Sequence, residues 1–438
     1  MRTLAGSAKS SRVTRREFLG GAVAAAAAPY ILPGRIFAGT APSDRFGIGV
    51  IGAGGRGGDH LNTCLGRGDC QVLAVCDPQQ AKRDGAKKHV EDHYAQKAGA
   101  GTYKGCGSSS DFRELLALPG IDAVFIASPE NWHALQLIAA VKAGKDVYCE
   151  KAMTLSHAEG LAVCDTVRRY GRVVQIGMQQ RSWGIFRQAC ELVRNQYIGK
   201  LHTIHVSVPG GRALPNAAPK PVPPGIDYEM WLGPAPYTPY DDQKCSFNWY
   251  FMLDYCLGWI QSWGIHYLDV AQWGAPSLCT KPLAVQGAAV FPADGPANTS
   301  ITWKVELDTA DGIHTIYTDD TQGRHGVKFS GDKGWVFVNR SGISAEPATL
   351  LKVKLRPEEE HLYEAYDHHQ CFFDCVRSRK DPSAPVEVGH SGNCLAIVSD
   401  VATRLERKVQ WDWAAQRFVN DDEANRMLSR PMRVPWTI

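Results

Sequence analysis

Residues 46–77 read FGIGVIGAGGRGGDHLNTCLGRGDCQVLAVCD, and this stretch decides the fold. A short apolar run is followed at once by Gly52, Gly54 and Gly57, which have the G-x-G-x-x-G spacing. These glycines permit a tight turn, a close approach of the backbone to a pyrophosphate, and close packing of a helix on its strand. A second apolar run ends at Asp77, where a carboxylate can accept hydrogen bonds from both hydroxyls of a ribose. The order of strand, turn, helix, strand and acid predicts a unit that binds a dinucleotide.

The glycine turn also predicts how the cofactor is held and which cofactor it is. The helix after the turn presents free backbone N–H groups and a partial positive charge to the phosphates. We therefore expect Gly55 and Arg56 of the same turn to contact the cofactor. Asp77 would repel a 2′-phosphate, and no arginine follows it until Arg83, so NAD is favoured over NADP. The competing interpretation, a glycine-rich turn that serves packing alone, does not explain the acid after the second strand.

Three further apolar runs are predicted to be strands that each end in polar residues. The three apolar runs are residues 122–128, 146–149 and 172–177. The polar segments that follow them are, in the same order, residues 129–133, 150–154 and 178–181. Ligands bind at the carboxyl ends of the strands in such sheets, so this convergence predicts the active site. The residues expected to contact the cofactor there are Ser128, Asn131, His133, Glu150, Lys151 and Gln179, and Arg181 is expected to contact the substrate.

After Arg181 the pattern changes from alternating strands and helices to strands in succession. The predicted strands cover residues 201–208, 283–290, 301–307, 314–318, 327–330 and 335–339. Strands without helical crossovers imply an antiparallel or mixed sheet. The predicted fold class is therefore α/β, with a doubly wound parallel Rossmann sheet in residues 44–180. A C-terminal α+β domain with an open, mainly antiparallel sheet is expected in residues 181–438.

The C-terminal half also contains a long loop and two late helices. The loop at residues 209–246 is rich in proline, glycine and aromatic residues. Such a loop is too long to be idle in a compact domain, and we expect it to cover the site or to reach a neighbouring subunit. The late helices, at residues 363–379 and 392–408, should pack on the assembly or back on the Rossmann domain. An extended tail is expected after Trp411.

Residues 1–41 are predicted to be an export signal. A basic start that includes Arg15-Arg16-Glu17-Phe18-Leu19 precedes an alanine-rich segment, residues 20–32, which is too short for a stable membrane span. The paired arginines resemble a twin-arginine (Tat) signal, whereas an ordinary basic leader or a disordered tail is the alternative. We expect a periplasmic or secreted protein that folds and takes up its nucleotide before the Tat machinery exports it.

Composition excludes several other classes of protein. The formal charge of the 438 residues is +3 and includes the basic leader, so we expect no nucleic-acid partner, and no later segment is apolar enough for a membrane span. The thirteen cysteines are scattered singly, which favours reduced, buried thiols over a disulfide framework. One cluster has metal-like spacing, but no second ligand pair accompanies it, so we predict packing and no metal. It comprises His368, His369, Cys371 and Cys375.

Several of these segments resemble the Gfo/Idh/MocA family, which includes glucose–fructose oxidoreductases and inositol dehydrogenases. The matching segments are GAGGRG at residues 52–57, SPENWH at 128–133, Glu150-Lys151, and GIHYLD at 264–269. The resemblance covers essentially the whole chain after the leader. It implies a Rossmann domain, an open C-terminal sheet, and redox chemistry on a sugar or polyol. We also expect a homo-oligomer formed through the face of the second sheet.

The sequence departs from the family pattern at two positions. The family usually has Glu-Lys-Pro, and here Ala152 replaces the proline. The family often has an aspartate four residues before the helical histidine, and here that position is Ser262. Ser262, His266 and Asp269 share one helical face by their spacing. Because a serine cannot carry a proton away as a carboxylate does, the lysine–aspartate–histidine relay implied by the resemblance is in doubt.

The chemistry also follows from the residues themselves. Oxidation of an alcohol carbon needs a base that takes the hydroxyl proton beside the nicotinamide. We predict that Lys151 is this base, because the charge of oxidised nicotinamide favours a neutral amine next to it. His266 is predicted to be the base or to fix a sugar hydroxyl, and Ser262 and Asp269 are expected to contact the substrate. The competing interpretations are a surface pair of Lys151 with Glu150, a core histidine, and a structural Asp269.

Three functions remain open at this point. Outside the cytoplasm there is no pool of free NAD, so the cofactor should stay bound and be recycled in the site. Oxidation of one sugar coupled to reduction of a second carbonyl compound satisfies this condition. Transient oxidation of a glycoside, elimination of the aglycone and reduction of the ketone also satisfy it. The third function is that of a non-catalytic carbohydrate-binding protein, which Ser262 favours and Glu150-Lys151 opposes.

Overall fold

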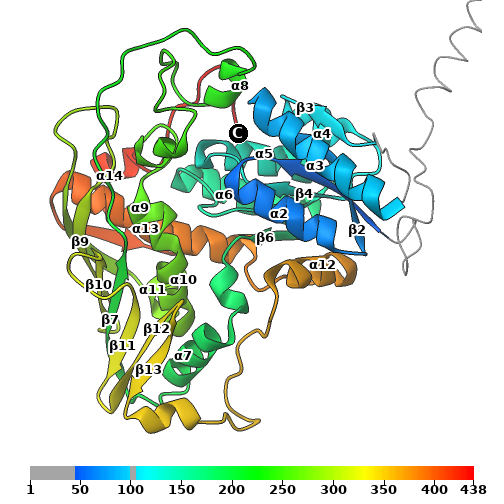
Figure 1. The fold of residues 1–438 in the computed structure, drawn as a ribbon. Coiled ribbons are helices and arrows are strands. Elements are labelled where there is room, and N and C mark those ends of the chain that lie inside the picture. Colours follow the sequence, from blue (N-terminus) through cyan, green and yellow to red (C-terminus); the bar gives the residue numbers. More distant parts are fainter. Residues whose placement is uncertain (1–44, 99–104) are drawn as a thin grey trace, which may run out of the picture.

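The computed structural model describes residues 45–98 and 105–438, and these form two sheets flanked by helices (Figure 1). The predicted export signal at residues 1–41 lies outside the described residues. Within the described ranges no helix is both long and apolar enough to cross a membrane. All thirteen cysteines are free thiols.

The first sheet has six parallel strands in the order β3-β2-β1-β4-β5-β6. Its strands are β1 (Phe46–Ile51), β2 (Cys70–Cys76), β3 (Gly107–Ser109), β4 (Ala123–Ile126), β5 (Asp146–Cys149) and β6 (Val174–Ile176). The order reverses between β1 and β4, and ligands bind doubly wound sheets at such a switch point. The predicted Rossmann sheet is confirmed.

Helices cover both faces of this sheet. They are α2 (Gly55–Gly66), α3 (Gln80–Ala98), α4 (Phe112–Ala117), α5 (Glu130–Lys142), α6 (His157–Tyr170) and, from the late chain, α12 (His368–Ser378). Alternate strand residues pack on α2, α3 and α12 on one side and on α4, α5 and α6 on the other. Phe372 and Phe373 of α12 are fully buried in the first of these cores, so the late helix belongs to the Rossmann sheet.

The second sheet has nine strands in the order β13-β12-β11-β7-β10-β9-β8-β14-β15. They are β7 (Leu201–Val208), β8 (Leu283–Val290), β9 (Thr302–Thr309), β10 (His314–Asp319), β11 (Gly326–Gly331), β12 (Gly334–Asn339), β13 (Gly342–Glu346), β14 (Val409–Asp412) and β15 (Arg417–Phe418). Only β7 and β10 pair in parallel, so the predicted open, mainly antiparallel sheet is confirmed.

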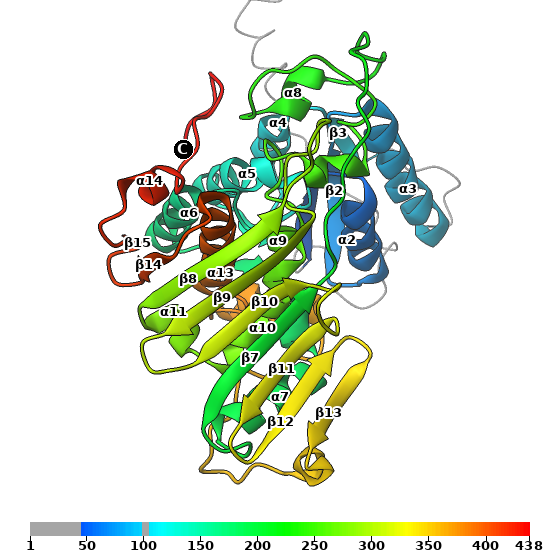
Figure 2. The same ribbon diagram turned by 90° about the vertical axis from the view of Figure 1, so that its left-hand side faces the viewer.

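One face of the second sheet packs on helices α7 (Gly184–Arg194), α10 (Gly264–Gly274) and α13 (Val386–Leu405), as Figure 2 shows. Short helical segments complete the chain. They are the 3₁₀ helices η3 (Gln179–Ser182), η4 (Phe247–Phe251) and η5 (Ala348–Lys352), and α8 (Tyr228–Leu232), α9 (Trp259–Ser262), α11 (Ser277–Thr280) and α14 (Asp422–Arg426). The tail after Trp411, expected to be extended, adds β15, which pairs with β14 at the sheet edge, and then forms α14.

Two helices begin earlier than the sequence predicts. Helix α5, which the sequence pattern predicts from about residue 134, begins at Glu130, so residues 131–133 lie in its first turn. Helix α13 begins at Val386, six residues before the predicted start. In both cases a proline, Pro129 or Pro385, occupies the N-cap, where its fixed φ and missing N–H are compatible with a helix start.

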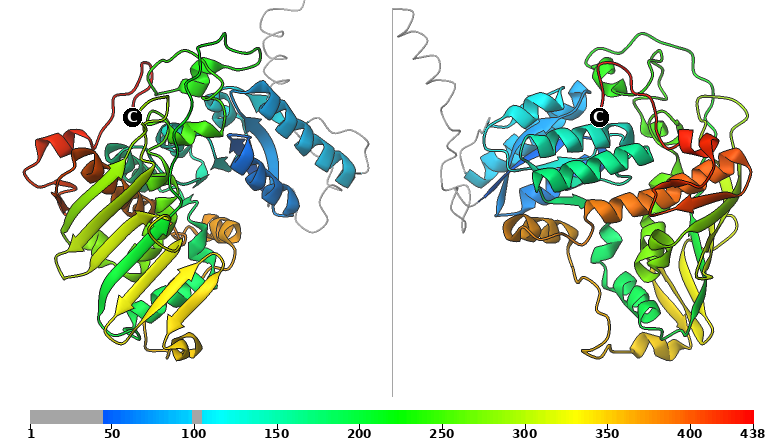
Figure 3. Two further views of the ribbon diagram at one scale, coloured as in Figure 1. Left: turned by 60° about the vertical axis from the view of Figure 1, so that its left-hand side comes forward. Right: turned by 180° about the vertical axis from the view of Figure 1, so that it is seen from behind.

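Residues 209–258, here called the crossing loop, leave the second sheet and pass over the Rossmann sheet (Figure 3). Within it, Gly225 accepts a hydrogen bond at 2.7 Å from the backbone of Gln80, which follows β2. Asp227 donates from its backbone to Pro78 at 3.0 Å, and the backbone of Asn131 donates to Tyr255 at 3.2 Å. The loop is therefore joined to the Rossmann domain of its own chain, and α8 and η4 lie within it.

Candidate functional site

A cavity of about 810 Å³ lies where the carboxyl ends of the Rossmann strands meet the crossing loop and α10. Eleven of the sixteen residues predicted from the sequence line it. They are Gly52, Gly54, Gly55, Arg56, Asp77, Ser128, His133, Glu150, Lys151, Gln179 and His266. The other five, which are Gly57, Asn131, Arg181, Ser262 and Asp269, do not line it.

The glycine turn forms a cradle at one end of the cavity. Gly54 is the N-cap of α2 and no side chain caps the helix, so its first N–H groups stay free for an anion. A Cβ at Gly55 would meet nothing within 4 Å. Gly52 has φ +85°, and a Cβ there would lie 2.6 Å from the backbone of Ala127. Gly57 serves packing, because its Cβ would lie 1.7 Å from the carbonyl oxygen of Gly52. These residues fit the pyrophosphate of a dinucleotide.

Asp77 lies at the end of β2 beside this cradle. Its carboxylate accepts hydrogen bonds from the backbone N–H groups of Ala53 and Gln79, both at 2.9 Å. Burial raises the pKa of Asp77, while the hydrogen bond from Gln79 and the charge of Lys82 act in the opposite direction. Lys82, which the sequence did not single out, also lines this end of the cavity.

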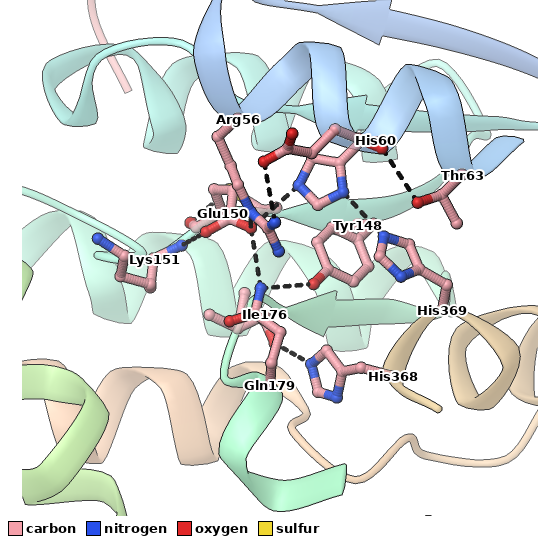
Figure 4. Close-up of polar contacts among 12 residues, drawn as sticks. Arg56, His60, Thr63, Tyr148, Glu150, Lys151, Ile176, Gln179, His368 and His369 are labelled. Carbon is pink, nitrogen blue, oxygen red and sulfur yellow. Dashed lines mark hydrogen bonds and ion pairs between the residues drawn. The ribbon is translucent and has the colours of Figure 1, made fainter. Parts of the chain in front are cut away.

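Glu150 is the centre of a buried polar network at the end of β5 (Figure 4). Its Oε1 accepts hydrogen bonds from Arg56 Nε at 2.9 Å and Gln179 Nε2 at 3.0 Å, and His60 Nε2 lies 3.0 Å away. Burial opposes the charge of this carboxyl, but the hydrogen bond and charge of His60 and the charge of Arg56 hold its pKa well below its usual range. His60 Nδ1 lies 2.8 Å from Nε2 of His369, which connects the network to α12.

The Lys151 amine lies between the cofactor side of the cavity and the end of α9. Its Nζ donates to the carbonyl oxygen of Ser262 at 3.0 Å and to the Ser262 hydroxyl at 3.1 Å. The ring of Tyr250 is centred 5.8 Å from the same Nζ. An amine nitrogen has three positions besides its bond to carbon, and the two serine oxygens use two of them, so the third is left for a substrate hydroxyl. Ser262 thus contacts the predicted base and not the cavity.

His266 lines the cavity on α10 and is only 7% exposed. Burial, followed by the charges of Lys151 and Arg340, holds the pKa of His266 well below its usual range. Its imidazole is therefore neutral near pH 7, and its Nδ1 is buried with no hydrogen-bond partner. A neutral ring with an unused nitrogen can bind a substrate hydroxyl or accept its proton.

Three of the predicted site residues have structural contacts instead. Arg181 and Asp269 form a buried ion pair with three hydrogen bonds of 2.8 to 3.0 Å, and Gln272 donates to the same carboxylate. Both charges are satisfied inside the protein, and neither side chain, although expected to contact the substrate, lines the cavity. Asn131 donates from Nδ2 to the carbonyl oxygen of Leu232 at 3.1 Å, which fastens the crossing loop.

The histidine and cysteine cluster on α12 is also used internally. His368 Nδ1 lies 2.7 Å from the Ser182 hydroxyl, and its Nε2 lies 3.0 Å from the carbonyl oxygen of Ile176. Cys371 and Cys375 contact the hydroxyl of Tyr363. No group of three or more potential ligands that could hold a metal ion occurs in residues 45–98 and 105–438.

Several further lining residues are not among the sixteen predicted site residues. Gln180 and Trp183 follow β6, Tyr250 comes from the crossing loop, and Arg340 comes from the turn between β12 and β13. Tyr250 stacks on Trp249 with ring centres 3.8 Å apart. No local motif marks Arg340, because its neighbours in the site lie far from it in sequence.

Two family models match the chain. One, described as "Oxidoreductase family, NAD-binding Rossmann fold", matches residues 46–178. The other, described as "Oxidoreductase family, C-terminal alpha/beta domain", matches residues 210–438. Together they cover the first sheet, every strand of the second sheet except β7, and residues 210–258 of the crossing loop.

Several curated proteins are similar to parts of this chain. An uncharacterized oxidoreductase of Bacillus subtilis (strain 168), YrbE, is 26% identical over 290 residues, which are 65% of this chain and 71% of that protein. A myo-inositol 2-dehydrogenase of Thermotoga maritima is 29% identical over 181 residues, 41% of this chain and 47% of that protein. A glycosyl hydrolase family 109 protein of Shewanella baltica (strain OS155) is 33% identical over 122 residues, 28% of this chain and 26% of that protein. The chain thus matches less than half the length of the last two.

Solved structures share the fold. An aldose-aldose oxidoreductase from Caulobacter crescentus complexed with glycerol has a TM-score of 0.61 at 17% identity and covers 83% of this chain and 99% of its own. GenD2 from gentamicin A biosynthesis, in complex with NAD, has a TM-score of 0.60 at 17% identity and covers 87% and 99%. At these identities the likeness concerns the fold alone.

Proposed function

The chain belongs to the Gfo/Idh/MocA oxidoreductase family, and on this premise we propose that it oxidises a CH–OH group of a sugar, polyol or glycoside with NAD as a tightly bound, recycled cofactor. The observation that carries the proposal is the position of the Lys151 amine. Lys151 lines the same cavity as the dinucleotide turn, which lies at the opposite end. Ser262 accepts two hydrogen bonds from the amine and so holds it in place.

The residues have separate roles in this reaction. NAD, when bound, supplies the acceptor for the hydride that leaves the alcohol carbon. The lone pair of Lys151 takes the hydroxyl proton, and the neutral ring of His266 orients the hydroxyl or shares that proton. Gly54 and Gly55 would hold the pyrophosphate, Asp77 the ribose of the adenosine half, and Gln179 the nicotinamide half. Ser128 and His133 complete the wall of the cofactor groove.

Retention of the cofactor is supported by the crossing loop. Met230, Trp231, Cys245 and Ser246 of this loop line the cavity together with the glycine turn. The backbone hydrogen bonds of the loop to Pro78 and Gln80 lie directly after Asp77, the predicted ribose ligand. Release of a nucleotide bound there would require these bonds to open, so slow exchange is expected.

Retention also fits an address outside the cytoplasm, where no free NAD replaces a lost molecule. We propose that the Arg15-Arg16 pair directs Tat export of the folded, loaded enzyme to the periplasm. Changing both arginines to lysine should leave the precursor in the cytoplasm. Normal periplasmic yield of that double variant would contradict the Tat route without affecting the proposed chemistry.

The decisive experiment starts with the purified protein and no added cofactor. Mass spectrometry of the nucleotide released on denaturation should identify NAD or NADH, and incubation with a sugar should change its redox state. Lys151→Met should lose about 10²–10⁴-fold in turnover while it retains the nucleotide. Full activity of Lys151→Met would refute the assignment of the base, and a protein that purifies without nucleotide would refute retention.

Glycoside cleavage is the second candidate, favoured by the 33% identity of one segment to a glycosyl hydrolase family 109 protein. It uses the same base and cofactor, but the ketone is reduced again before release. Aryl glycosides distinguish the two functions, because only the cleaving enzyme releases the phenol with no net change in bound NAD. Binding of sugars with neither redox change nor cleavage would identify a non-catalytic carbohydrate-binding protein.

A further inference from the structure

Arg340 brings a positive charge to the substrate end of the cavity from a part of the chain remote from the Rossmann motifs. It lies in the turn between β12 and β13 and lines the cavity together with Lys151 and His266. Its guanidinium carbon lies 5.0 Å from the ring centre of Trp263, and the ring of His266 lies 5.6 Å from the same indole. Trp263 therefore holds the arginine and the histidine on one wall.

The guanidinium of Arg340 has no carboxylate partner among the described residues. Its contact there is a hydrogen bond at 3.4 Å to Oε1 of Gln180, a neutral acceptor. By contrast, the other arginine of the cavity, Arg56, is paired with Glu150 at 2.9 Å. Arg340 thus keeps most of its five N–H donors for a ligand.

Gln180 adds a second, independent sign of a missing ligand. It is only 2% exposed and lines the cavity, and its Nε2 has no hydrogen-bond partner. The hydrogen bond from Arg340 identifies the opposite atom of the amide as the oxygen, so Nε2 is the donor left over. A buried donor without a partner destabilises the protein, and a bound acceptor would remove that cost.

We propose that the substrate is an anionic sugar, whose charged oxygen group is bound by Arg340 and the Nε2 of Gln180 while Lys151 and His266 face the reacting CH–OH. This inference rests on the proposed function and adds its substrate class. Arginine binds planar carboxylates and phosphates through paired N–H groups, and a neighbouring amide N–H adds a third donor. The three carboxylates lining the cavity do not occupy this position. Glu150 pairs with Arg56, Asp77 lies at the glycine turn, and Glu130 contacts the backbone of Ala152.

Binding measurements test the proposal without relying on turnover. Calorimetric titration of the holoprotein would use D-glucuronate, D-glucose 6-phosphate and D-glucose, and the corresponding galactose series. At least one anionic sugar should bind about 10- to 100-fold more tightly than its neutral counterpart, the range of a charge-assisted hydrogen-bond pair. The sugar that shows this gain in affinity, the uronate or the phosphate, identifies the anionic group that the site binds.

Arg340→Gln should remove this gain and leave the affinity for the neutral hexose unchanged, whereas Arg340→Lys should retain part of it. Arg324→Gln is the matched control, since Arg324 is exposed in the connection between β10 and β11, stacks on Phe337 and does not line the cavity. Equal binding of anionic and neutral sugars, or the same loss in both arginine variants, would overturn the inference. Lys151→Met should lose turnover and keep the anion preference. Anion binding by the wild-type holoprotein without turnover of any sugar would contradict the proposed function and leave this site standing.

Discussion

Ser262→Asp is the sharpest test of the base, because it places a carboxylate against the Lys151 amine. The amine now lies 3.1 Å from the serine hydroxyl, which carries no charge. A carboxylate in that position would lie about 4 Å or less from Nζ, where two unit charges attract by about 4 kcal/mol at an effective dielectric constant of about 20. This attraction stabilises the ammonium form, which cannot take a proton from the substrate.

The magnitude follows from the conversion between free energy and pH. Because about 1.4 kcal/mol corresponds to one pH unit, the acid limb of the kcat/KM profile should move upward by about 1–3 units. The assay is kcat/KM against pH for the sugar that the wild-type holoprotein oxidises. Ser262→Asn is the control, since it has the size of aspartate and no charge and should leave the limb in place.

One result would refute this reasoning. If Ser262→Asp retains its nucleotide and its acid limb coincides with that of the wild type, the Lys151 amine is not the titrating base. His266 would then be the group to examine next, because its neutral ring also lines the cavity. If the acid limb of the pH profile also shifts in Ser262→Asn, the cause is a displaced Lys151 side chain and not the added charge.

Three further changes test other parts of the molecule. Asp77→Ala should weaken NAD binding and reduce the preference for NAD over NADP, as measured by titration with both nucleotides. An unchanged preference would mean that the carboxylate does not face the ribose. Gly233→Ala should speed nucleotide loss in a dilution assay, because φ is +57° and the new Cβ would lie 2.3 Å from the ring of Trp132. Gly312→Ala is the control, since its φ of +93° gives the same kind of backbone strain with nothing within 4 Å of the new Cβ, and it should leave the rate of nucleotide loss unchanged. Burial lowers the pKa of His368 to about 4, so the unfolded state binds more protons below pH 6.5 and stability is lost as the pH falls from there toward 4. His368→Gln should therefore be less destabilising at pH 5 than at pH 7.5 by about 2 kcal/mol in denaturant unfolding, and an equal effect at both values would show that this ring does not titrate.

The Rossmann unit could be predicted because its determinants are local. Gly52 and Gly57 are needed within a single turn, where a Cβ at either would collide with backbone a few residues away or on the adjacent strand. The parallel sheet then places every strand end at one edge, so Glu150 and Lys151 could be assigned to the cavity from their position alone. Such inferences need only the strand order, which the motif determines.

Some predicted site residues do not line the cavity because partners inside the protein bind their polar groups. Arg181 follows a strand end, as a substrate ligand would, but Asp269 lies close enough in the folded chain to neutralise it. Asn131 likewise bonds Leu232, which is 101 residues away. Nothing in the spacing of these residues distinguishes a charge satisfied by the protein from one left for a substrate.

The sequence by itself determined the two sheets, the dinucleotide turn and the amine at the end of β5. The tertiary structure alone decided what surrounds that amine. It brought Ser262 to Lys151 over 111 residues, Arg340 to Gln180 over 160 residues, and the crossing loop onto Gln80. Local motifs encode backbone turns, because steric contacts among a few neighbouring residues determine the conformation of a turn. The electrostatics of a cavity depend on which distant charges are desolvated together, and only the complete packing of the chain determines that.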